Sequence, residues 1–197
     1  KTRYNIRLAA RKGVTVHWSR SEEDLKKFFD LYEITAVRDK IGHRPYEYFK
    51  RMVDAYGSSD LLRIYIAEHE GEPLSGAICI HYGNKTWYIY GASSNNKRNL
   101  MPNYAMQAEM IRWGFENGSK IYDFGGVFIL DKTNGLYKFK EGFCRREGAT
   151  EFIGEFDLVY NRLLYTGFAK VLPMVQRQRN RKHQQESVQP APKPEKE

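Results

Sequence analysis

The sequence is poor in cysteine and contains no long apolar run. Only Cys79 and Cys144 are present among 197 residues, too few for a disulfide scaffold, and they fit buried thiols in a reducing cytoplasm. No stretch approaches the ~18 consecutive apolar residues of a membrane-spanning helix. Residues 1–12 lack the apolar core of a signal peptide, and a start at Lys1 rather than Met suggests a piece of a longer protein. A content of 41% hydrophobic residues excludes a mainly disordered chain.

The apolar periodicity predicts an α+β fold with a mixed, mostly antiparallel central sheet and helices on both faces. This layout resembles the GNAT superfamily of N-acetyltransferases. The expected helices are Tyr4–Lys12, one begun by Ser21 and Asp24 whose apolar stripe reaches Val37, one with Pro45 in its first turn, Tyr104–Phe115, a turn at Leu136–Phe143, and Arg162–Val171. The expected strands are Val14–Trp18, Leu62–His69, Leu74–Tyr82, Thr86–Ala92, Lys120–Phe124 and Glu151–Tyr160.

Positive charge is concentrated at the two ends of the chain. The formal net charge is +8, and residues 1–20 hold six basic and no acidic residues. Residues 176–197 hold six basic residues against three acidic ones, which leaves the body nearly neutral. We therefore expect a basic linker or helix end over residues 1–13, a GNAT-like domain over 14–175 and a basic, Pro-rich disordered tail over 176–197. Either a polyanion binds these ends, or they are a solvated helix and a solubilising tail.

Several common catalytic signatures are missing from the sequence. There is no Walker loop, no GxGxxG after a strand and no GxSxG elbow. The five histidines have no metal-ligand spacing, so we expect no metal. No glycine occurs between Gly91 and Gly114, where acetyltransferases of this layout carry the glycine-rich turn that binds the pyrophosphate of acetyl-CoA. This absence argues against ordinary acetyl transfer.

The remaining candidate residues lie in the loop-rich segments. Arg44, in the break before Pro45, is free to clamp a phosphate or carboxylate, or is simply an exposed arginine. Tyr90 is a ligand contact or a rim aromatic, and Asp123 before Gly125 marks a tight turn or a ligand loop. The densest segment is 135–143, where two lysines lie between aromatics and glycines; by itself it predicts an amphipathic turn with core aromatics and solvated lysines.

Two motifs in this region carry a family resemblance. Asp123-Phe124-Gly125-Gly126, followed by Gly135-Leu136-Tyr137-x-Phe139-Lys140-x-Gly142-Phe143, closely resembles the FemABX family of peptidoglycan-bridge aminoacyltransferases. The opening segment 1–14 resembles the stretch that links the two acetyltransferase-like domains of that family, and Gly154–Asp157 with Tyr160 also fits. The resemblance covers residues 1–170 and matches the second domain only.

The resemblance implies transfer of an amino acid from aminoacyl-tRNA to the stem-peptide amine of a UDP- or lipid-linked muramyl-pentapeptide, without CoA, metal or another cofactor. It implies that Lys140 supplies positive charge near the developing oxyanion and that the Phe139 carbonyl holds the attacking amine. Arg44, Tyr48 and Tyr90 correspond to acceptor-binding residues. Further candidate substrate contacts are Asp123, Gly125 and Tyr137. The candidate tRNA-binding residues are Arg11, Lys12, Arg177, Arg179, Arg181 and Lys182.

Two other functions stay open beside this one. The same fold also suits an acyl-CoA-dependent N-acyltransferase, which CoA binding would reveal. A non-catalytic module that binds a nucleotide-sugar or RNA would bind those ligands without Lys140-dependent turnover. The expected location is the cytoplasm, with possible contact at the inner membrane face, and a preceding GNAT-like domain of the same protein is a candidate partner.

Overall fold

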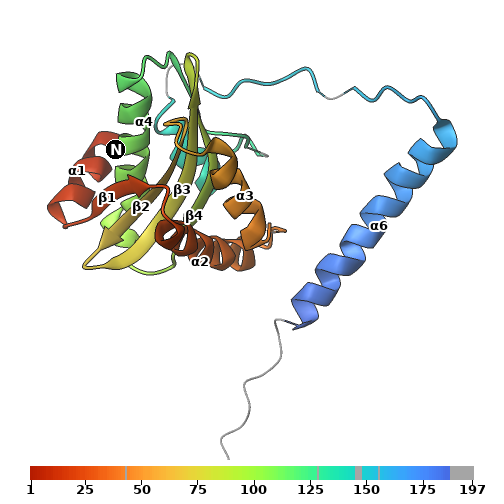
Figure 1. Ribbon diagram of the computed structural model, residues 1–197, viewed down its shortest axis with the longest axis horizontal. Helices are drawn as coiled ribbons and strands as arrows, with labels where there is room; N and C mark the ends of the chain where they lie inside the picture. Colours follow the sequence, from red (N-terminus) through yellow and green to blue (C-terminus); the bar gives the residue numbers. More distant parts are fainter. Residues whose placement is uncertain (43, 128, 145–147, 155, 187–197) are drawn as a thin grey trace, which may run out of the picture. The chain divides into compact units, whose positions relative to one another are not determined.

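The computed structural model describes residues 1–42, 44–127, 129–144, 148–154 and 156–186, with side chains described as far as residue 177 (Figure 1). The chain divides into two compact units, residues 1–150 and 151–197, whereas the sequence places the end of the domain at residue 175. No helix in the described ranges combines the length and the apolar character that a membrane span requires.

The first unit is built on a five-stranded sheet of order β1-β2-β3-β4-β5. The first four strands are antiparallel and β5 pairs parallel to β4, as the predicted mixed sheet requires. Helices α1 and α4 cover one face, and α2 and α3 cover the other (Figure 1). The strands are β1 (Thr15–Ser19), β2 (Leu62–His69), β3 (Glu72–Tyr82), β4 (Lys85–Ser93) and β5 (Ile121–Asp123). The helices of this unit are α1 (Thr2–Arg11), α2 (Glu22–Asp39), α3 (Tyr46–Tyr56), the 3₁₀ helix η1 (Arg98–Leu100), α4 (Pro102–Glu116) and α5 (Gly135–Glu141).

Each face of the sheet has its own apolar core. On the α2 and α3 face, Phe28 and Phe49 are fully buried among the strand residues Ile64, Ile66 and Ile78. The α1 and α4 face buries smaller and softer side chains, which are Ala9, Ala67, Ala77, Cys79, Met106 and Met110. Burial of a Phe or Leu side chain contributes roughly 1.5–3 kcal/mol, so these two cores fix the helices on the sheet.

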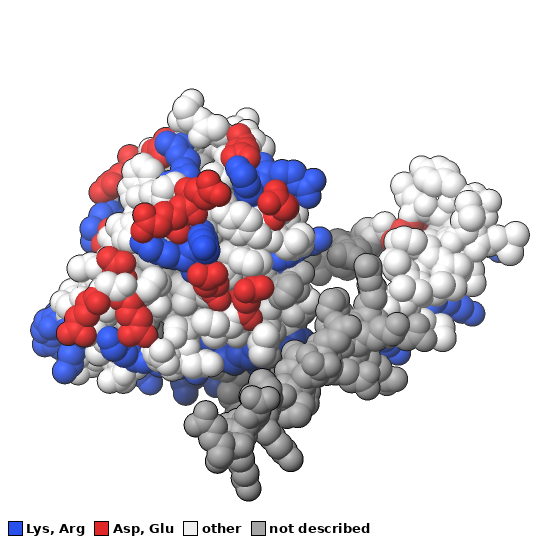
Figure 2. Space-filling view, turned by 60° about the horizontal axis from the view of Figure 1, so that its bottom comes forward, with Lys and Arg blue, Asp and Glu red and all other residues white. Residues whose placement is uncertain are grey.

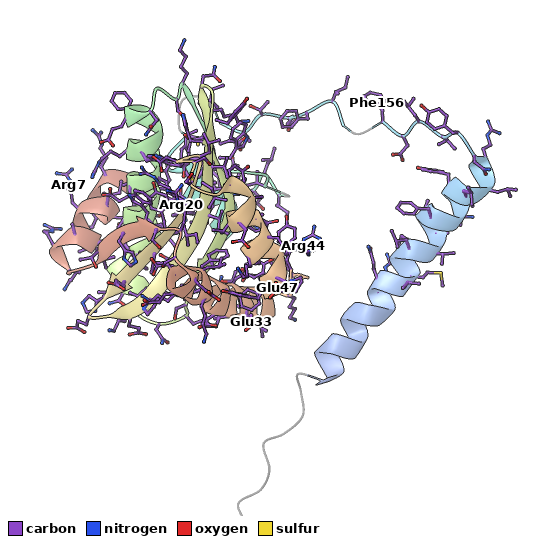
Figure 3. The ribbon with its side chains drawn as sticks, in the orientation of Figure 1. Arg7, Arg20, Glu33, Arg44, Glu47 and Phe156 are labelled. Atoms are coloured by element: carbon purple, nitrogen blue, oxygen red, sulfur yellow. The ribbon has the colours of Figure 1, made fainter. Side chains whose placement is uncertain are left out.

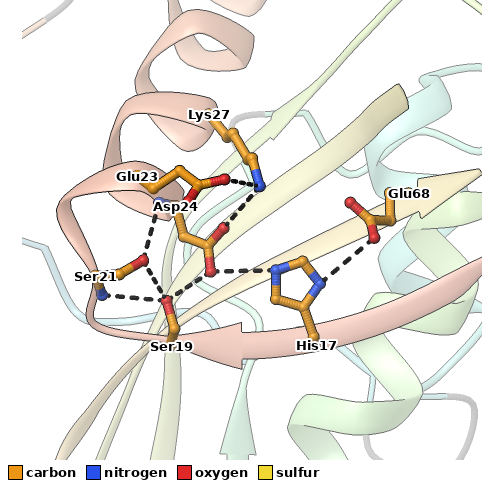
Figure 4. A network of polar contacts seen from close by, with 7 residues as sticks. All are labelled: His17, Ser19, Ser21, Glu23, Asp24, Lys27 and Glu68. Carbon is orange, nitrogen blue, oxygen red and sulfur yellow. Dashed lines mark hydrogen bonds and ion pairs between the residues drawn. The ribbon is translucent and has the colours of Figure 1, made fainter. Parts of the chain in front are cut away.

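A polar network fixes the junction between β1 and α2 (Figure 4). The Ser21 side chain caps α2 by accepting from the Asp24 backbone N–H at 3.1 Å, as the sequence predicts. The Asp24 carboxylate is only 5% exposed and accepts from the Ser19 hydroxyl at 2.5 Å and contacts the His17 ring at 3.1 Å. Burial raises the pKa of Asp24, but the hydrogen bonds from Ser19, His17 and Lys27 outweigh it and hold the pKa below its usual value.

A bulge interrupts β4 and separates two tyrosines. Tyr90 pairs with Ile78 of β3, whereas Tyr88 pairs with the next residue, Cys79, so Ile89 is extra in the ladder. Side chains two residues apart normally share a face of a sheet. Here Tyr88 packs into the core under α4, and Tyr90 packs into the core under α2 and α3.

Three expectations from the sequence differ from the structure. Val37, predicted as part of the buried stripe of α2, is 73% exposed because the helix turns that position to solvent. The predicted strand Glu151–Tyr160 is wrong for the residues described there: none is in a strand, and Phe152 is 88% exposed, so its alternating pattern meets no partner strand. Pro45 is the residue before the first turn of α3 rather than within it.

The second unit consists of an extended segment and a long helix, α6 (Arg162–Glu186). The helix continues through residues 176–186, for which the sequence predicts disorder. Most side chains on its first half are uncharged, as the white surface of this unit in Figure 2 shows. Large apolar side chains in this unit are exposed, among them Phe152, Phe156, Tyr160, Leu163 and Phe168.

Candidate active site

Lys140 lies in the last turn of the seven-residue helix α5 and points back to the loop after β5. Its Nζ donates to the carbonyl oxygens of Gly126 at 2.9 Å and Gly125 at 3.4 Å. Partial burial lowers the pKa of Lys140, and the negative charge of Asp123 only partly offsets that effect. The side chain is therefore an ammonium group held in a fixed position and only partly hydrated.

The end of α5 leaves the Phe139 carbonyl without a backbone donor. The N–H of Gly142 donates to the Lys138 carbonyl, as in an α-helix, but the N–H of Phe143 donates to Lys140, one residue closer. This tightening of the last turn skips the carbonyl oxygen of Phe139, to which no donor bonds among the residues described. A hydrogen-bond acceptor that the helix does not use therefore immediately precedes the ammonium group of Lys140.

Asp123 and Gly125 shape the turn that receives Lys140. One oxygen of the Asp123 carboxylate accepts from the Gly125 backbone N–H at 2.8 Å, and the other pairs with Lys85 at 2.7 Å. Burial raises the pKa of Asp123, but the hydrogen bonds from Lys85 and Gly125 and the charge of Lys140 hold it below the usual value. Gly125 has φ +69°, and a Cβ there would lie 3.4 Å from the Tyr88 carbonyl oxygen. Both carboxylate oxygens are thus engaged in holding the turn.

A cluster of aromatic rings packs α5 against the rest of the first unit. The Phe143 ring packs 5.3 Å from Phe124, 5.5 Å from Phe139 and 5.7 Å from Tyr104, measured between ring centroids. Tyr104 also meets Phe139 edge-on at 5.0 Å. Such contacts add about 0.5–1.5 kcal/mol each beyond their buried area, so they fix the position of a helix too short to be stable alone.

A second group forms around Tyr48 on the α3 side. The Tyr48 and Tyr90 hydroxyls lie 3.0 Å apart, and the Arg44 guanidinium lies 5.1 Å from the centroid of the Tyr48 ring. Burial, with the hydrogen bond to Tyr48, raises the pKa of Tyr90 to about 12, so this hydroxyl is neutral near pH 7. Arg44 is exposed, and among the described residues no carboxylate pairs with it. The structure therefore brings together the three residues predicted to bind the acceptor.

Strand β4 connects the two groups. The Tyr88 carbonyl faces Gly125, and Tyr90 lies two residues further along the strand, about 7 Å at the usual rise. Pairing between β4 and β5 ends at Trp87 and Asp123, where β5 itself ends, and the loop that receives Lys140 follows directly. The bulge at Ile89 then turns Tyr90 toward Arg44. Strand β4 therefore lies beside the Lys140 turn at Tyr88 and carries Tyr90 of the second group.

The other predicted residues lie apart from this centre or outside the description. The Tyr137 backbone N–H donates to the Asn134 side chain that caps α5, and its hydroxyl has no hydrogen-bond partner in the described part of the chain. Arg11 and Lys12 are exposed at the end of α1. Arg177 is exposed on α6, whereas the side chains of Arg179, Arg181 and Lys182 lie outside the description. No group of His, Cys, Asp and Glu in the described ranges is arranged to hold a metal ion.

Sequence reasoning missed three residues that build the site. Lys85 pairs with Asp123, Asn134 caps α5 at 3.0 Å, and the Tyr88 carbonyl faces Gly125. The cap has a sequence signal, since an Asn stands directly before the expected helix. The other two depend on the register between β4 and β5, which a single sequence does not reveal.

Comparisons with known proteins match most of the chain. A model of the FemAB family matches residues 1–70 and 62–172. The chain is 39% identical to a UDP-N-acetylmuramoylpentapeptide-lysine N(6)-alanyltransferase of Weissella viridescens, over 86% of this chain and 50% of the relative. It is 31% identical to a lipid II:glycine glycyltransferase of Staphylococcus epidermidis, over 88% of this chain and 56% of the relative. The chain thus spans about half the length of the curated relatives it matches.

Solved structures confirm the predicted fold. A crystal structure of FemX superposes with a TM-score of 0.68 at 27% identity, over 84% of this chain and 58% of that one. The aminoglycoside acetyltransferase AAC(6')-Iy superposes with a TM-score of 0.56 at 13% identity, over 74% of this chain and 98% of that one. The second likeness, at this low identity, shows the fold alone, which is the GNAT-like α+β arrangement.

Proposed function

Because the chain belongs to the FemAB family, we propose that it transfers an amino acid from aminoacyl-tRNA to the stem-peptide amine of a muramyl-pentapeptide, UDP-linked or lipid-linked. The activities for which the two relatives are named support this reaction, since one adds alanine to a lysine N6 of the pentapeptide precursor and the other adds glycine to lipid II. The chain is then the part of such an enzyme that carries Lys140, working alone or beside a preceding GNAT-like domain, in the cytoplasm or at the membrane face.

The observation that carries the proposal is the pairing of Phe139 and Lys140. The carbonyl oxygen of Phe139, an acceptor that no donor in the described part of the chain uses, belongs to the residue just before Lys140. The Lys140 ammonium is itself held by its hydrogen bond to the Gly126 carbonyl. The reaction needs both groups, because an alkyl ammonium must be bound and must lose a proton before it attacks an ester. Its pKa near 10.4 makes deprotonation at pH 7 cost about 4–5 kcal/mol. Orientation of the amine beside a fixed positive charge reduces the barrier that remains.

The proposed reaction is an aminolysis of the ester donor. The acceptor ammonium, hydrogen-bonded to the Phe139 carbonyl, loses a proton to solvent, and its nitrogen forms a C–N bond to the ester carbonyl carbon. The oxygen of that carbonyl becomes negative in the tetrahedral intermediate, and the Lys140 ammonium stabilises it. The intermediate collapses with loss of the second amine proton, the C–O bond to the ribose breaks, and the ribose oxygen takes up a proton. One amide, one free tRNA and one net proton result.

Arg44, Tyr48 and Tyr90 are proposed to bind the acceptor. A guanidinium with no carboxylate partner among the described residues suits the phosphates or carboxylates of a muramyl-peptide precursor. Tyr90 offers a hydroxyl donor that, like any tyrosine, is protonated at neutral pH, and burial raises its pKa further. Asp123 and Gly125, in contrast, act by positioning Lys140, since their polar groups are already bonded within the chain.

A transfer assay with the Lys140→Met variant tests the proposal. Wild-type chain is mixed with tRNAs charged with Gly, Ala or Ser and with UDP-muramyl-pentapeptide or its lipid-linked form. Loss of the ammonium is expected to lower transfer by roughly 10²–10³-fold, as for removal of one oxyanion donor. Lys120→Met, the same change at an exposed position before β5, is the matched control and should keep the wild-type rate.

Transfer that persists in Lys140→Met would remove Lys140 from the mechanism. Binding of acetyl-CoA with acetyl transfer to an amine would favour the acyl-CoA-dependent alternative instead. RNA or nucleotide-sugar binding with no transfer, in the chain and in the longer parent protein, would favour a binding module.

A further inference from the structure

A groove of about 250 Å³ lies between the start of α1, the first turn of α4 and α5. Its lining residues include Thr2, Tyr104, Lys138, Phe139 and Glu141, whose carboxylate pairs with Lys132 at 3.6 Å. The Thr2 hydroxyl donates to the Gly142 carbonyl at 2.8 Å, so the start of α1 is joined directly to the end of α5. The groove therefore reaches the helix that carries both Phe139 and Lys140.

An unpaired basic stripe begins at the same end of α1. Arg3, Arg7 and Arg11 lie four residues apart on one face, opposite the buried Asn5 and Ala9 that pack toward α4. No acidic residue occurs in α1, and no carboxylate pairs with these arginines in the described ranges. Lys138, at the groove itself, is also exposed without an ion pair among the described residues. Over the face shown in Figure 2, by contrast, positive and negative side chains are interspersed.

The groove and the Arg44 group lie on opposite faces of the sheet. Arg7 projects from α1 on one side of the molecule and Arg44 lies beside α3 on the other (Figure 3). The groove reaches α5, which carries Lys140, on the α1 and α4 face, whereas Arg44 and Tyr48 lie on the α2 and α3 face. Two bulky substrates bound at these places would not compete for the same surface.

We propose that this groove admits the 3′ end of the RNA donor, and that Arg3, Arg7 and Lys138 bind its phosphates. The inference rests on the proposed function, since it assigns the donor to one face of that site and leaves the other to the acceptor. A polyanion gains most from a row of cations without acidic neighbours. Tyr104, one of the lining residues, brings to the groove an aromatic ring of the kind on which unpaired bases stack.

Binding of an uncharged tRNA transcript to the whole chain tests this surface. Fluorescence anisotropy is followed over a salt series for wild type, the double variant Arg3→Gln/Arg7→Gln and the single variant Lys138→Gln. Loss of two phosphate contacts is expected to weaken binding roughly 10–30-fold at ~0.1 M salt and to make the log–log salt slope shallower by about 1.4–1.8. Lys138→Gln is expected to change the slope by about half that amount.

The control is Lys26→Gln/Arg51→Gln, which removes two exposed charges from α2 and α3 on the other face. Equal weakening in the control, or unchanged RNA binding in Arg3→Gln/Arg7→Gln, would overturn the assignment. In the transfer assay the double variant should raise the KM for the charged tRNA and leave the KM for the muramyl-pentapeptide unchanged. Loss of RNA binding in this variant, with no transfer by the wild-type chain or by the longer parent protein, would contradict the proposed function and support the surface.

Discussion

Two groups of aromatic rings, one on each side of the active site, are built in different ways. The group on the α2 and α3 side centres on Phe49, which is fully buried and packs 4.9 Å from Tyr32 and 5.0 Å from Tyr90. The group under α5 centres on Phe143, which is only half-buried. The first rests on α2, α3 and the central strand β4, whereas the second joins the seven-residue helix α5, the residue after the three-residue strand β5 and a single ring of α4, Tyr104.

The Phe49 group therefore contributes mainly to the stability of the fold, and the Phe143 group mainly to the position of the residues proposed for the chemistry. The Phe49 group belongs to the main core, so it holds Tyr48 and Tyr90 as rigidly as the fold itself. The Phe143 group holds Lys140 and Phe139 through few contacts, in a part of the chain where local opening costs less than global unfolding. The side proposed to bind the acceptor is thus fixed in advance, and the turn proposed to be catalytic is the part whose position a substitution disturbs most easily.

The largest effect is expected from paired truncations of these two rings. Phe49→Ala should lower the free energy of unfolding by about 3–5 kcal/mol, because it empties a fully buried site. Phe143→Ala should cost roughly half as much, yet it should lower transfer at least tenfold under conditions where the variant stays folded, because Lys140 is displaced. Urea unfolding and the transfer assay measure the two quantities. Equal losses of stability, with full activity in Phe143→Ala, would contradict the contrast drawn between the groups.

The sequence predicts the Phe49 side better than the Phe143 side for a physical reason. Apolar spacing in α2 and α3 and alternation in β2 to β4 are local patterns, so the core face of each element is readable without the fold. The predicted burial of Val37 is wrong because a stripe of apolar residues does not show at which residue a helix leaves the core. The bulge at Ile89 and the pairing of Lys85 with Asp123 arise from register between strands, which depends on the partner strand as well.

The unused carbonyl of Phe139 and the secondary structure of residues 151–160 and 176–186 could not be predicted from the sequence for similar reasons. Whether a helix ends with α-type or 3₁₀-type bonds is a matter of fractions of an ångström, which residue types do not specify. Alternation over 151–160 predicts a strand only where a neighbouring strand offers hydrogen bonds. Residues 176–186 are helical because Gln, Arg and Lys are good helix formers, although their charge suggested disorder.

The pH dependence of transfer offers a second, intermediate effect. The rate should rise with pH as the acceptor amine loses its proton, and fall again as Lys140 loses its charge. Because burial lowers the pKa of Lys140, the fall should begin below the pH at which an ordinary lysine titrates. In Lys140→Arg the guanidinium stays charged, so the falling limb should move to higher pH, whatever the loss in maximal rate.

Initial rates, corrected for spontaneous hydrolysis of the ester donor, measure this profile from pH 6 to 10. Lys120→Arg is the control, because it makes the same exchange on the surface and should leave both limbs in place. A falling limb that does not move in Lys140→Arg would assign it to another group and would leave Lys140 without a role in its charged form.

The smallest effect on transfer is expected from a change in the Phe49 group, at the hydroxyl of Tyr48 that is proposed to contact the acceptor. Tyr48→Phe keeps the ring beneath the Arg44 guanidinium and removes only the hydroxyl that lies 3.0 Å from that of Tyr90. Since one hydrogen bond contributes about 0.5–1.5 kcal/mol, the KM for the muramyl-pentapeptide should rise about 2–10-fold with little change in kcat. Tyr56→Phe, on the same helix and against the same core, should change neither constant. If the two variants behave alike, the Tyr48 hydroxyl contributes nothing to the acceptor site, and the fixed geometry of this side lies in its rings alone.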